Sequence, residues 1–293
     1  MRRLVLLAAL VGVPVFAQDA DTLTADDGWR RALIATLAGN QATFSNWQEG
    51  GVDALAATAS LDGRFDRVVG VVLTKQSLRM ALGVLQQDTL SVRKALDVAR
   101  YAASAEVMHG HAVRPAASLT VRTQFAPGYD YSPDSTKYPS LVVVPGQSLK
   151  ISDAFSPLIL SQTAGIAWAP GGGFVARVGL GLKETVVAIP RLREVQGNAP
   201  DQAARIEAGV STELLLKRPL MDNVSIESRL TSFQGFGQLG QTAPDALFET
   251  TLLLKVNTLL NVTIDTAAMY DADVSPDVQL REALSVGISV GIL

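Results

Sequence analysis

The chain contains no cysteine among its 293 residues. It therefore has no disulfide framework, no thiolate metal site and no cysteine nucleophile. Beyond its first residues it also lacks any apolar run near the roughly 20 residues that a membrane-spanning helix needs. Positive charge is not in excess either, because 25 Lys and Arg residues stand against 28 Asp and Glu residues. This balance excludes a polybasic nucleic-acid-binding protein.

The first residues have the pattern of a secretory signal peptide. Arg2 and Arg3 form a basic start, residues 4–13 are apolar, and residues 15–17 are typical of a cleavage site. A stretch of roughly ten apolar residues is too short to span a bilayer, which disfavours a membrane anchor. We expect residues 1–17 to be a signal peptide, residues 18–28 a periplasmic tail and residues 29–293 a single barrel domain.

Hydrophobic residues make up 48 % of the chain, against 18 % that are charged. In the last stretch, residues 278–293, apolar residues alternate with small or polar ones, and Glu282 alone interrupts the apolar face. A period of two predicts a β-strand that turns one face toward an apolar environment. The apolar face consists of Val278, Leu280, Leu284, Val286, Ile288, Val290 and Ile292.

Similar alternation recurs and predicts about twelve strands, an even number, as in bacterial single-chain barrels. The expected strands lie at about 29–44, 54–73, 78–84, 94–108, 117–125, 158–168, 174–183, 205–216, 224–230, 248–256, 262–270 and 278–293. The strand at 94–108 alternates less cleanly, which indicates a β-bulge. Trp29, at the start of the first strand, is expected to be an interfacial anchor.

The connections fall into two groups. Short turns are expected at 74–76, 109–115, 170–173, 219–223 and 257–261, all at one end of the strands, whereas the long loops at 127–153, 190–203 and 234–246 lie at the other. Transmembrane barrels sort their connections in this way, and a soluble β-sandwich has no reason to do so.

We therefore predict an all-β fold, a transmembrane antiparallel up-and-down β-barrel. The expected location is the bacterial outer membrane, with the N- and C-termini periplasmic and the short turns on the periplasmic side. The expected partners are outer-membrane lipid and the outer-membrane assembly machinery, which would recognise the apolar C-terminal strand. No nucleic acid is expected to bind.

The polar faces of the strands carry many charges of both signs, which are expected to line the lumen. As binding or selectivity candidates we take Arg64, Arg122, Gln124, Arg177, Lys183, Arg205, Glu207, Glu213, Glu227, Arg229, Glu249, Lys255, Asp265 and Arg281, with Arg79 and Asp62 on the same face. Two interpretations remain open. The charges form a polar pore that selects small solutes, or they fill a structural lumen with ion pairs.

Few residues point to catalysis or to metal binding. The two histidines, His109 and His111, lie in a turn at the expected periplasmic rim, where a hydrolase in the wall would lack its base. Asp271, Asp273 and Asp277 do not follow the EF-hand pattern, so an Asx turn is favoured over a calcium site. We expect no enzymatic activity, no metal site and no cofactor.

Three segments also resemble, in order, the motifs of a known family of uncharacterised bacterial outer-membrane β-barrel proteins, a domain of unknown function. They are residues 44–51, with Asn-Trp and Gly-Gly; Arg122-Thr123-Gln124-Phe125-Ala126-Pro127-Gly128-Tyr129-Asp130; and residues 269–288. Family members usually end in an aromatic residue, whereas this chain ends in Leu293. The resemblance implies a barrel in the outer membrane and no reaction.

The sequence thus favours two functions. The first is a porin-like narrow channel or transporter for small polar solutes, whose solute is unknown. The alternative is a non-enzymatic structural or surface-interaction barrel, in which a side-chain-filled lumen supports the long loops.

Overall fold

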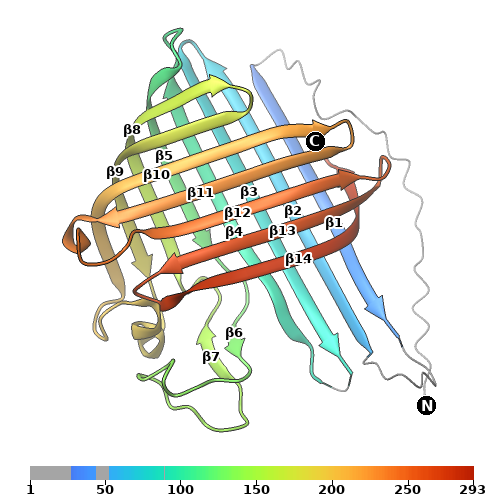
Figure 1. Ribbon diagram of the computed structural model, residues 1–293, viewed down its shortest axis with the longest axis vertical. Helices are drawn as coiled ribbons and strands as arrows, with labels where there is room; N and C mark the ends of the chain where they lie inside the picture. The colour runs from blue at the N-terminus through green and yellow to red at the C-terminus, as the bar shows by residue number, and fades with distance from the viewer. Residues whose placement is uncertain (1–27, 44–52, 89) are drawn as a thin grey trace.

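The computed structural model describes residues 28–43, 53–88 and 90–293. In this part of the chain twelve strands form one closed barrel, and β6 and β7 form a separate small sheet (Figure 1). The strands are β1 (Trp29–Ala42), β2 (Ala54–Val69), β3 (Val72–Gln87), β4 (Arg93–Val107), β5 (Val113–Thr123), β6 (Gly128–Asp130), β7 (Leu149–Ser152), β8 (Leu158–Gly171), β9 (Phe174–Val186), β10 (Ala204–Met221), β11 (Val224–Gly235), β12 (Asp245–Lys255), β13 (Leu260–Asp271) and β14 (Ser275–Gly291).

Barrel strands pair antiparallel in chain order, except that β5 pairs with β8 across the β6–β7 loop, and β1 pairs with β14 to close the ring. Strands β8 to β14 run obliquely across the wall formed by β1 to β5 (Figure 1). The number of barrel strands and their up-and-down order confirm the prediction. Among the described residues, no helix is long and apolar enough to cross a membrane.

The outer face of the barrel is apolar because alternate residues of each strand point away from the lumen. Leu37, Leu180 and Leu280 are 66 %, 67 % and 79 % exposed, values that would be costly for large aliphatic side chains in water. Hydrocarbon around the ring removes that cost. Further exposed outward side chains are Leu82, Val84, Ile166, Val178, Leu182, Ile206, Val210, Leu284, Val286, Ile288 and Val290.

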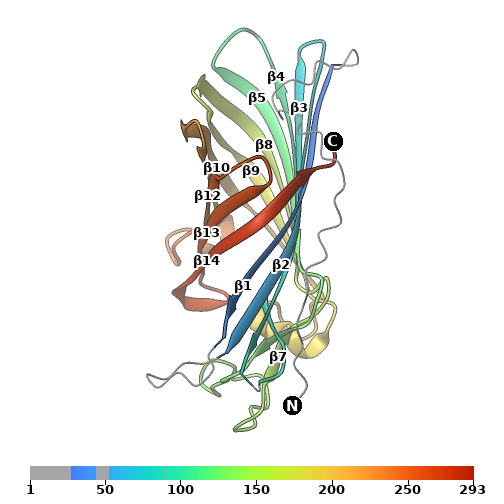
Figure 2. The ribbon, with the colours of Figure 1, turned by 90° about the vertical axis from the view of Figure 1, so that its right-hand side faces the viewer.

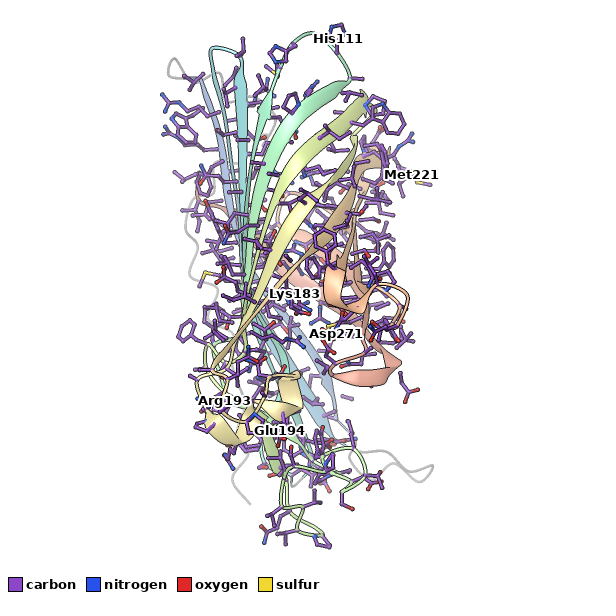
Figure 3. The ribbon with its side chains drawn as sticks, turned by 90° about the vertical axis from the view of Figure 1, so that its left-hand side faces the viewer. His111, Lys183, Arg193, Glu194, Met221 and Asp271 are labelled. Carbon is purple, nitrogen blue, oxygen red and sulfur yellow. The ribbon has the colours of Figure 1, made fainter. Side chains whose placement is uncertain are left out.

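The two ends of the barrel differ as predicted. At the end that holds Trp29 and the C-terminus, strands are joined by residues 70–71, 108–112, 172–173, 222–223 and 256–259; we call this the short-turn end. The opposite, long-loop end carries residues 124–157, 187–203 and 236–244. Figure 3 shows His111 at the short-turn end and Arg193 and Glu194, of the 3₁₀ helices η1 (Pro190–Leu192) and η2 (Glu194–Gln196), at the other.

Some predicted turns are wrong in position. Residues 74–76 lie inside β3, and the chain turns earlier, at Gly70 and Val71. Gly70 has a φ of 57°, which a tight hairpin turn of two residues requires. The apolar run from Val68 to Leu73 concealed this turn, because both arms of the hairpin are apolar there.

Other strands extend further into the predicted turns and loops than expected. Strand β10 continues through Pro219 to Met221, and a register shift between these two residues accommodates the proline at the strand end. Strand β13 starts at Leu260 and runs to Asp271, and β14 starts at Ser275, so the predicted loop at 271–277 is only a tight turn. At these positions, pairing with the neighbouring strand continues through residues whose local sequence favours a turn.

The bulge expected in the strand at 94–108 is present. Gly83 of β3 pairs with Leu96 of β4, but the next residue, Val84, pairs with Lys94, so Ala95 has no partner in β3. The predicted signal peptide, most of the tail and the Asn-Trp and Gly-Gly motif of residues 44–51 lie outside the described residues.

Candidate functional site: the ion-paired lumen

The lumen is lined by ion pairs rather than by an apolar core. Because residues of one strand alternate between its two faces, the charged positions predicted to face inward lie on the same side and meet inside the ring. Most of the predicted lumen residues form ion pairs there, namely Arg64, Arg177, Lys183, Arg205, Glu207, Glu213, Glu227, Arg229, Glu249 and Asp265, with Arg79 and Asp62.

The most buried cluster centres on Arg177 of β9. Its Nη2 lies 2.7 Å from Glu106 Oε1, and its Nη1 lies 2.6 Å from Glu213 Oε2. Arg114 Nη1 approaches the other oxygen of Glu106 at 3.3 Å, and Arg229 pairs with Glu213. The side chains of Arg177 and Glu106 are 7 % and 1 % exposed. Each charge therefore has an opposite partner, without which its burial would be strongly unfavourable.

Other ion pairs cross the lumen. Arg100 on β4 pairs with Glu249 on β12, and these strands lie opposite each other in the ring. Arg79 Nη2 on β3 is 3.0 Å from Asp265 Oδ1 on β13. Side chains from facing walls thus meet in the middle of the barrel, which narrows any path through it.

Not every part of the lumen is dry. Arg64 Nη2 on β2 reaches across to Glu227 Oε2 on β11 at 3.2 Å, yet the two side chains are 41 % and 44 % exposed. Exposed ion pairs of this kind are screened by solvent and add little to stability. The lumen is therefore open around Arg64 and Glu227, whereas the side chains of Arg100 and Arg177 are largely buried.

A further group of charges lies toward the long-loop end. Lys183 Nζ is 2.5 Å from Asp245 Oδ2 and 3.4 Å from Asp271 Oδ2, and Figure 3 shows Lys183 and Asp271 pointing toward each other. Arg205 Nη1 pairs with Asp273 Oδ2 at 2.6 Å, and its Nη2 lies 3.3 Å from Glu207 Oε2.

These contacts also explain the aspartates near residue 271. Asp271 Oδ1 accepts a hydrogen bond from the backbone N–H of Asp273 at 3.1 Å, which is an Asx turn. Asp271 Oδ2 pairs with Lys183, and Asp273 Oδ2 pairs with Arg205.

Four predicted lumen residues form no ion pair with any residue that the structure describes. Lys255 lies at the short-turn end of β12, and Arg281 lies on β14. Arg122 extends across the lumen to Met269 Sδ, 3.7 Å away. Gln124 lies beyond the end of β5, where its Nε2 donates to the backbone oxygens of Asp153 and Ser156 at 2.8 and 3.0 Å. Gln124 thus holds the long loop rather than lining the lumen wall.

The segment that carries the family motif anchors loop 124–157 to the barrel rim. Asp97 of β4 accepts hydrogen bonds from the backbone N–H groups of Phe125 and Ala126, both at 2.8 Å. Lys94 Nζ binds Asp97 Oδ2 at 3.0 Å and the backbone oxygen of Ala126 at 2.8 Å. A Cβ atom at Gly128 would lie 2.2 Å from Ser152 Oγ, so β6 and β7 can approach there only with glycine.

Inside this loop, Asp130, the last residue of β6, binds residues further along the loop. Its burial opposes ionisation, but hydrogen bonds from the backbone N–H of Ser132 and from the side chains of Tyr138 and Lys137 outweigh it and hold the pKa of Asp130 below its usual range. The ionised carboxylate accepts from Tyr138 Oη at 2.9 Å and from Lys137 Nζ at 3.2 Å. The loop is therefore an ordered platform.

Sequence reasoning missed several members of the lumen network, above all Arg100 and Glu106. Their signal is present but weak, because alanine occurs on both faces of this segment and reduces the contrast between them. The bulge at Ala95 further breaks the period before this segment.

These features define a class: the chain is a closed β-barrel of the transmembrane type, with an apolar exterior and an ion-paired lumen. Residues 39–129 match the family model described as "Protein of unknown function (DUF3078)". This segment includes most of the motif that starts at Arg122. The expected resemblance to a family of unknown function is thereby confirmed.

Comparison with solved structures gives distant likenesses at 10 % identity. They include the translocator domain of the autotransporter NalP from Neisseria meningitidis, with a TM-score of 0.36 and coverage of 92 % of this chain and 89 % of that one. The COG4313 outer membrane channel from Pseudomonas putida F1 has a TM-score of 0.39, with coverage of 89 % and 94 %. No curated protein sequence matches the chain. Likenesses this remote assign no activity.

Proposed function

We propose that the protein is a bacterial outer-membrane β-barrel with both termini on the periplasmic side. The apolar outer face, exposed at positions such as Leu180 and Leu280, supports a lipid environment. The grouping of short turns at one end and long loops at the other supports the orientation. In this proposal the partners are outer-membrane lipid along the wall and the assembly machinery at β14.

Within the membrane we infer a narrow channel for small polar solutes or ions. The observation that carries this proposal is the half-exposed ion pair of Arg64 and Glu227, which requires water inside the ring. A lumen that served only to fill the barrel would be more stable with packed apolar residues than with charges. The Arg100–Glu249 pair, between opposite strands, is the constriction in this proposal.

Single-channel conductance in planar bilayers tests the channel. We expect the wild type to give a small conductance, because the ion pairs narrow the path. The double substitution Arg100→Ala with Glu249→Ala removes both arms of the constriction without leaving one charge unpaired, and should raise the conductance severalfold. Glu282→Gln, on the outer face, is the control and should leave it unchanged. A folded wild type and a folded double variant that both fail to conduct would refute the channel.

A second candidate is a non-enzymatic structural or surface-interaction barrel. The ion pairs that join opposite walls favour it, because they hold the ring closed, and so does the ordered loop 124–157. In that case the wild type should not conduct, and shortening the loop between β6 and β7 should abolish surface binding while the barrel still assembles. Neither candidate needs catalysis, and we propose no enzymatic role; phospholipid hydrolysis by the purified protein would contradict this.

A further inference from the structure

The barrel closes where β1 pairs with β14, and we call this junction the seam. Its ladder is shorter than that of any other pair of neighbouring barrel strands. Among the described residues, strands β1 and β14 pair between residues 34–38 and 287–291, with further backbone hydrogen bonds between Leu33 and residues 292–293, whereas β1 pairs with β2 from Trp29 to Ala42 and β14 pairs with β13 from Ser275 onward. Continued in the same register, the seam would join Asn40 to Ser285, but no backbone pair of described residues forms there. Figure 2 shows β14 diverging from β1 toward the long-loop end.

In this unpaired part of the seam, residues 39–42 of β1 and 275–286 of β14, side chains on both faces of the wall are exposed. Leu280 and Leu284, on the outer face, are 79 % and 56 % exposed, and Gln279 and Arg281, on the lumen face, are exposed as well. Asn40 Nδ2 donates to the backbone oxygen of Leu284 at 3.1 Å, so a side-chain hydrogen bond is present where a backbone pair is missing. A strand edge in hydrocarbon is costly unless polar groups satisfy it.

Two guanidinium groups that form no ion pair with a described residue, those of Arg122 and Arg281, lie on the lumen side of this region. Strand pairing places Gln279 beside Met269 and Arg281 beside Ala267. Arg122 arrives at the same place from the opposite wall, because its Nη2 contacts Met269 Sδ at 3.7 Å.

The acidic groups that act on Arg122 have other ion-pair partners. Glu249 and Asp271 are the acidic groups that act on Arg122. Glu249 is paired with Arg100, however, and Asp271 with Lys183. Positive charge in the lumen thus lies directly behind an apolar, unpaired stretch of wall.

We propose that the unpaired part of the seam is a lateral binding site for a long-chain carboxylate. The carboxylate would be held by Arg281 and Arg122, whose planar guanidinium groups bind carboxylates through paired hydrogen bonds. The alkyl chain would pass between β1 and β14 and lie against Leu280 and Leu284. This site goes beyond the proposed channel, because conduction along the lumen does not depend on it.

Binding of a long-chain carboxylate with a nitroxide near its methyl end, followed by electron paramagnetic resonance in uncharged detergent, tests the site. Arg281→Gln and Arg122→Gln should each raise the dissociation constant by about tenfold, as expected for loss of a charge-assisted hydrogen bond. The control Arg218→Gln, an exposed position near the short-turn end, should not change it. The methyl ester of the same probe should bind at least tenfold more weakly.

Closing the seam supplies an independent test. The chain has no cysteine, so a disulfide between Asn40→Cys and Ser285→Cys would lock the unpaired part without competing thiols. The oxidised variant should lose binding, and a reductant should restore it. The control pair, Thr36→Cys with Ser289→Cys, joins positions that are already paired and should bind the probe in both states.

Three results would overturn the site: equal binding of acid and methyl ester, an unchanged dissociation constant in the Arg122 and Arg281 variants, or full binding by the locked barrel. Failure of the conductance experiment would leave these readouts intact, because binding of the probe is measured without ion flow. The two proposals therefore succeed or fail separately.

Discussion

Glu106 shows at the scale of one residue how the lumen is stabilised. Its carboxylate is almost fully buried between Arg177 and Arg114, and Arg177 in turn reaches Glu213. An isolated charge at this depth would be strongly disfavoured. The network compensates this cost because each of its charges contacts a charge of opposite sign. The same interdependence makes the network sensitive to the loss of one member.

Glu106→Gln should therefore destabilise the barrel. The substitution keeps the size of the side chain but leaves Arg177 and Arg114 with less compensation, and we expect the free energy of unfolding to fall by roughly 3–5 kcal/mol. Urea titration of the detergent-inserted protein, followed by tryptophan fluorescence, measures this. Glu282→Gln, at an exposed outward position, is the matched control. An effect of Glu106→Gln no larger than that of the control would contradict the assigned role.

At the scale of an element, loop 124–157 and the β1–β14 seam are the parts that depart from a plain barrel. The loop begins within the family motif, and its first backbone N–H groups are satisfied by Asp97 rather than by a neighbouring strand. The seam is held by a short ladder and by side chains, among them Thr36 Oγ1 and Ser289 Oγ, 2.7 Å apart.

Asp97→Asn should loosen the loop while the barrel stays closed. The amide oxygen is a weaker acceptor than a carboxylate and loses the ion pair with Lys94. Limited proteolysis should then cut loop 124–157 several times faster than in the wild type. Asp201→Asn, in loop 187–203, should leave that rate unchanged. Equal rates in all three proteins would show that Asp97 does not anchor the loop.

The seam can be tested with two glycines on the same face of β14. A Cβ atom at Gly287 would lie 2.9 Å from Ala38 Cβ and 3.0 Å from the backbone oxygen of Leu37, whereas one at Gly291 would meet nothing within 4 Å. Gly287→Val should push β14 away from β1 and lower the unfolding temperature, and Gly291→Val should not. Thermal unfolding followed by circular dichroism distinguishes them, and identical unfolding temperatures would argue against a tight seam.

At the scale of the whole molecule, the apolar outer wall and the sorted connections together support the proposed placement of the protein in a membrane. Charged groups gather inside the ring, and the long connections leave one end. The surface-interaction proposal depends on this placement, because it needs the long-loop end to face outward.

Epitope tags test the orientation in intact bacteria. A tag inserted after Gly146, in loop 124–157, should bind antibody on intact cells, because this loop is expected outside. A tag in the turn between His109 and His111 should bind antibody only after the outer membrane is permeabilised. The reverse pattern would invert the proposed orientation, and labelling of neither tag in cells that hold folded protein would contradict an outer-membrane location.

The barrel and most of its inward charges were predictable from the sequence, because both depend on a local period. Alternation along β14 or β10 assigns each residue to a face whatever lies opposite, and connection lengths sort the ends. Turn positions were less predictable where apolar residues run through the turn, as around Gly70. Gln124 was misplaced because alternation continues past the residue where β5 ends.

The sequence by itself determined most of the side chains that enter the lumen, since a period of two needs no knowledge of distant partners. The tertiary structure alone decided which charges meet. Arg100 and Glu249 are 149 residues apart and pair because ring closure places β4 opposite β12. It also decided that Arg122 and Arg281 form no ion pair with a described residue and that β14 diverges from β1, because both depend on how the last strand returns to the first.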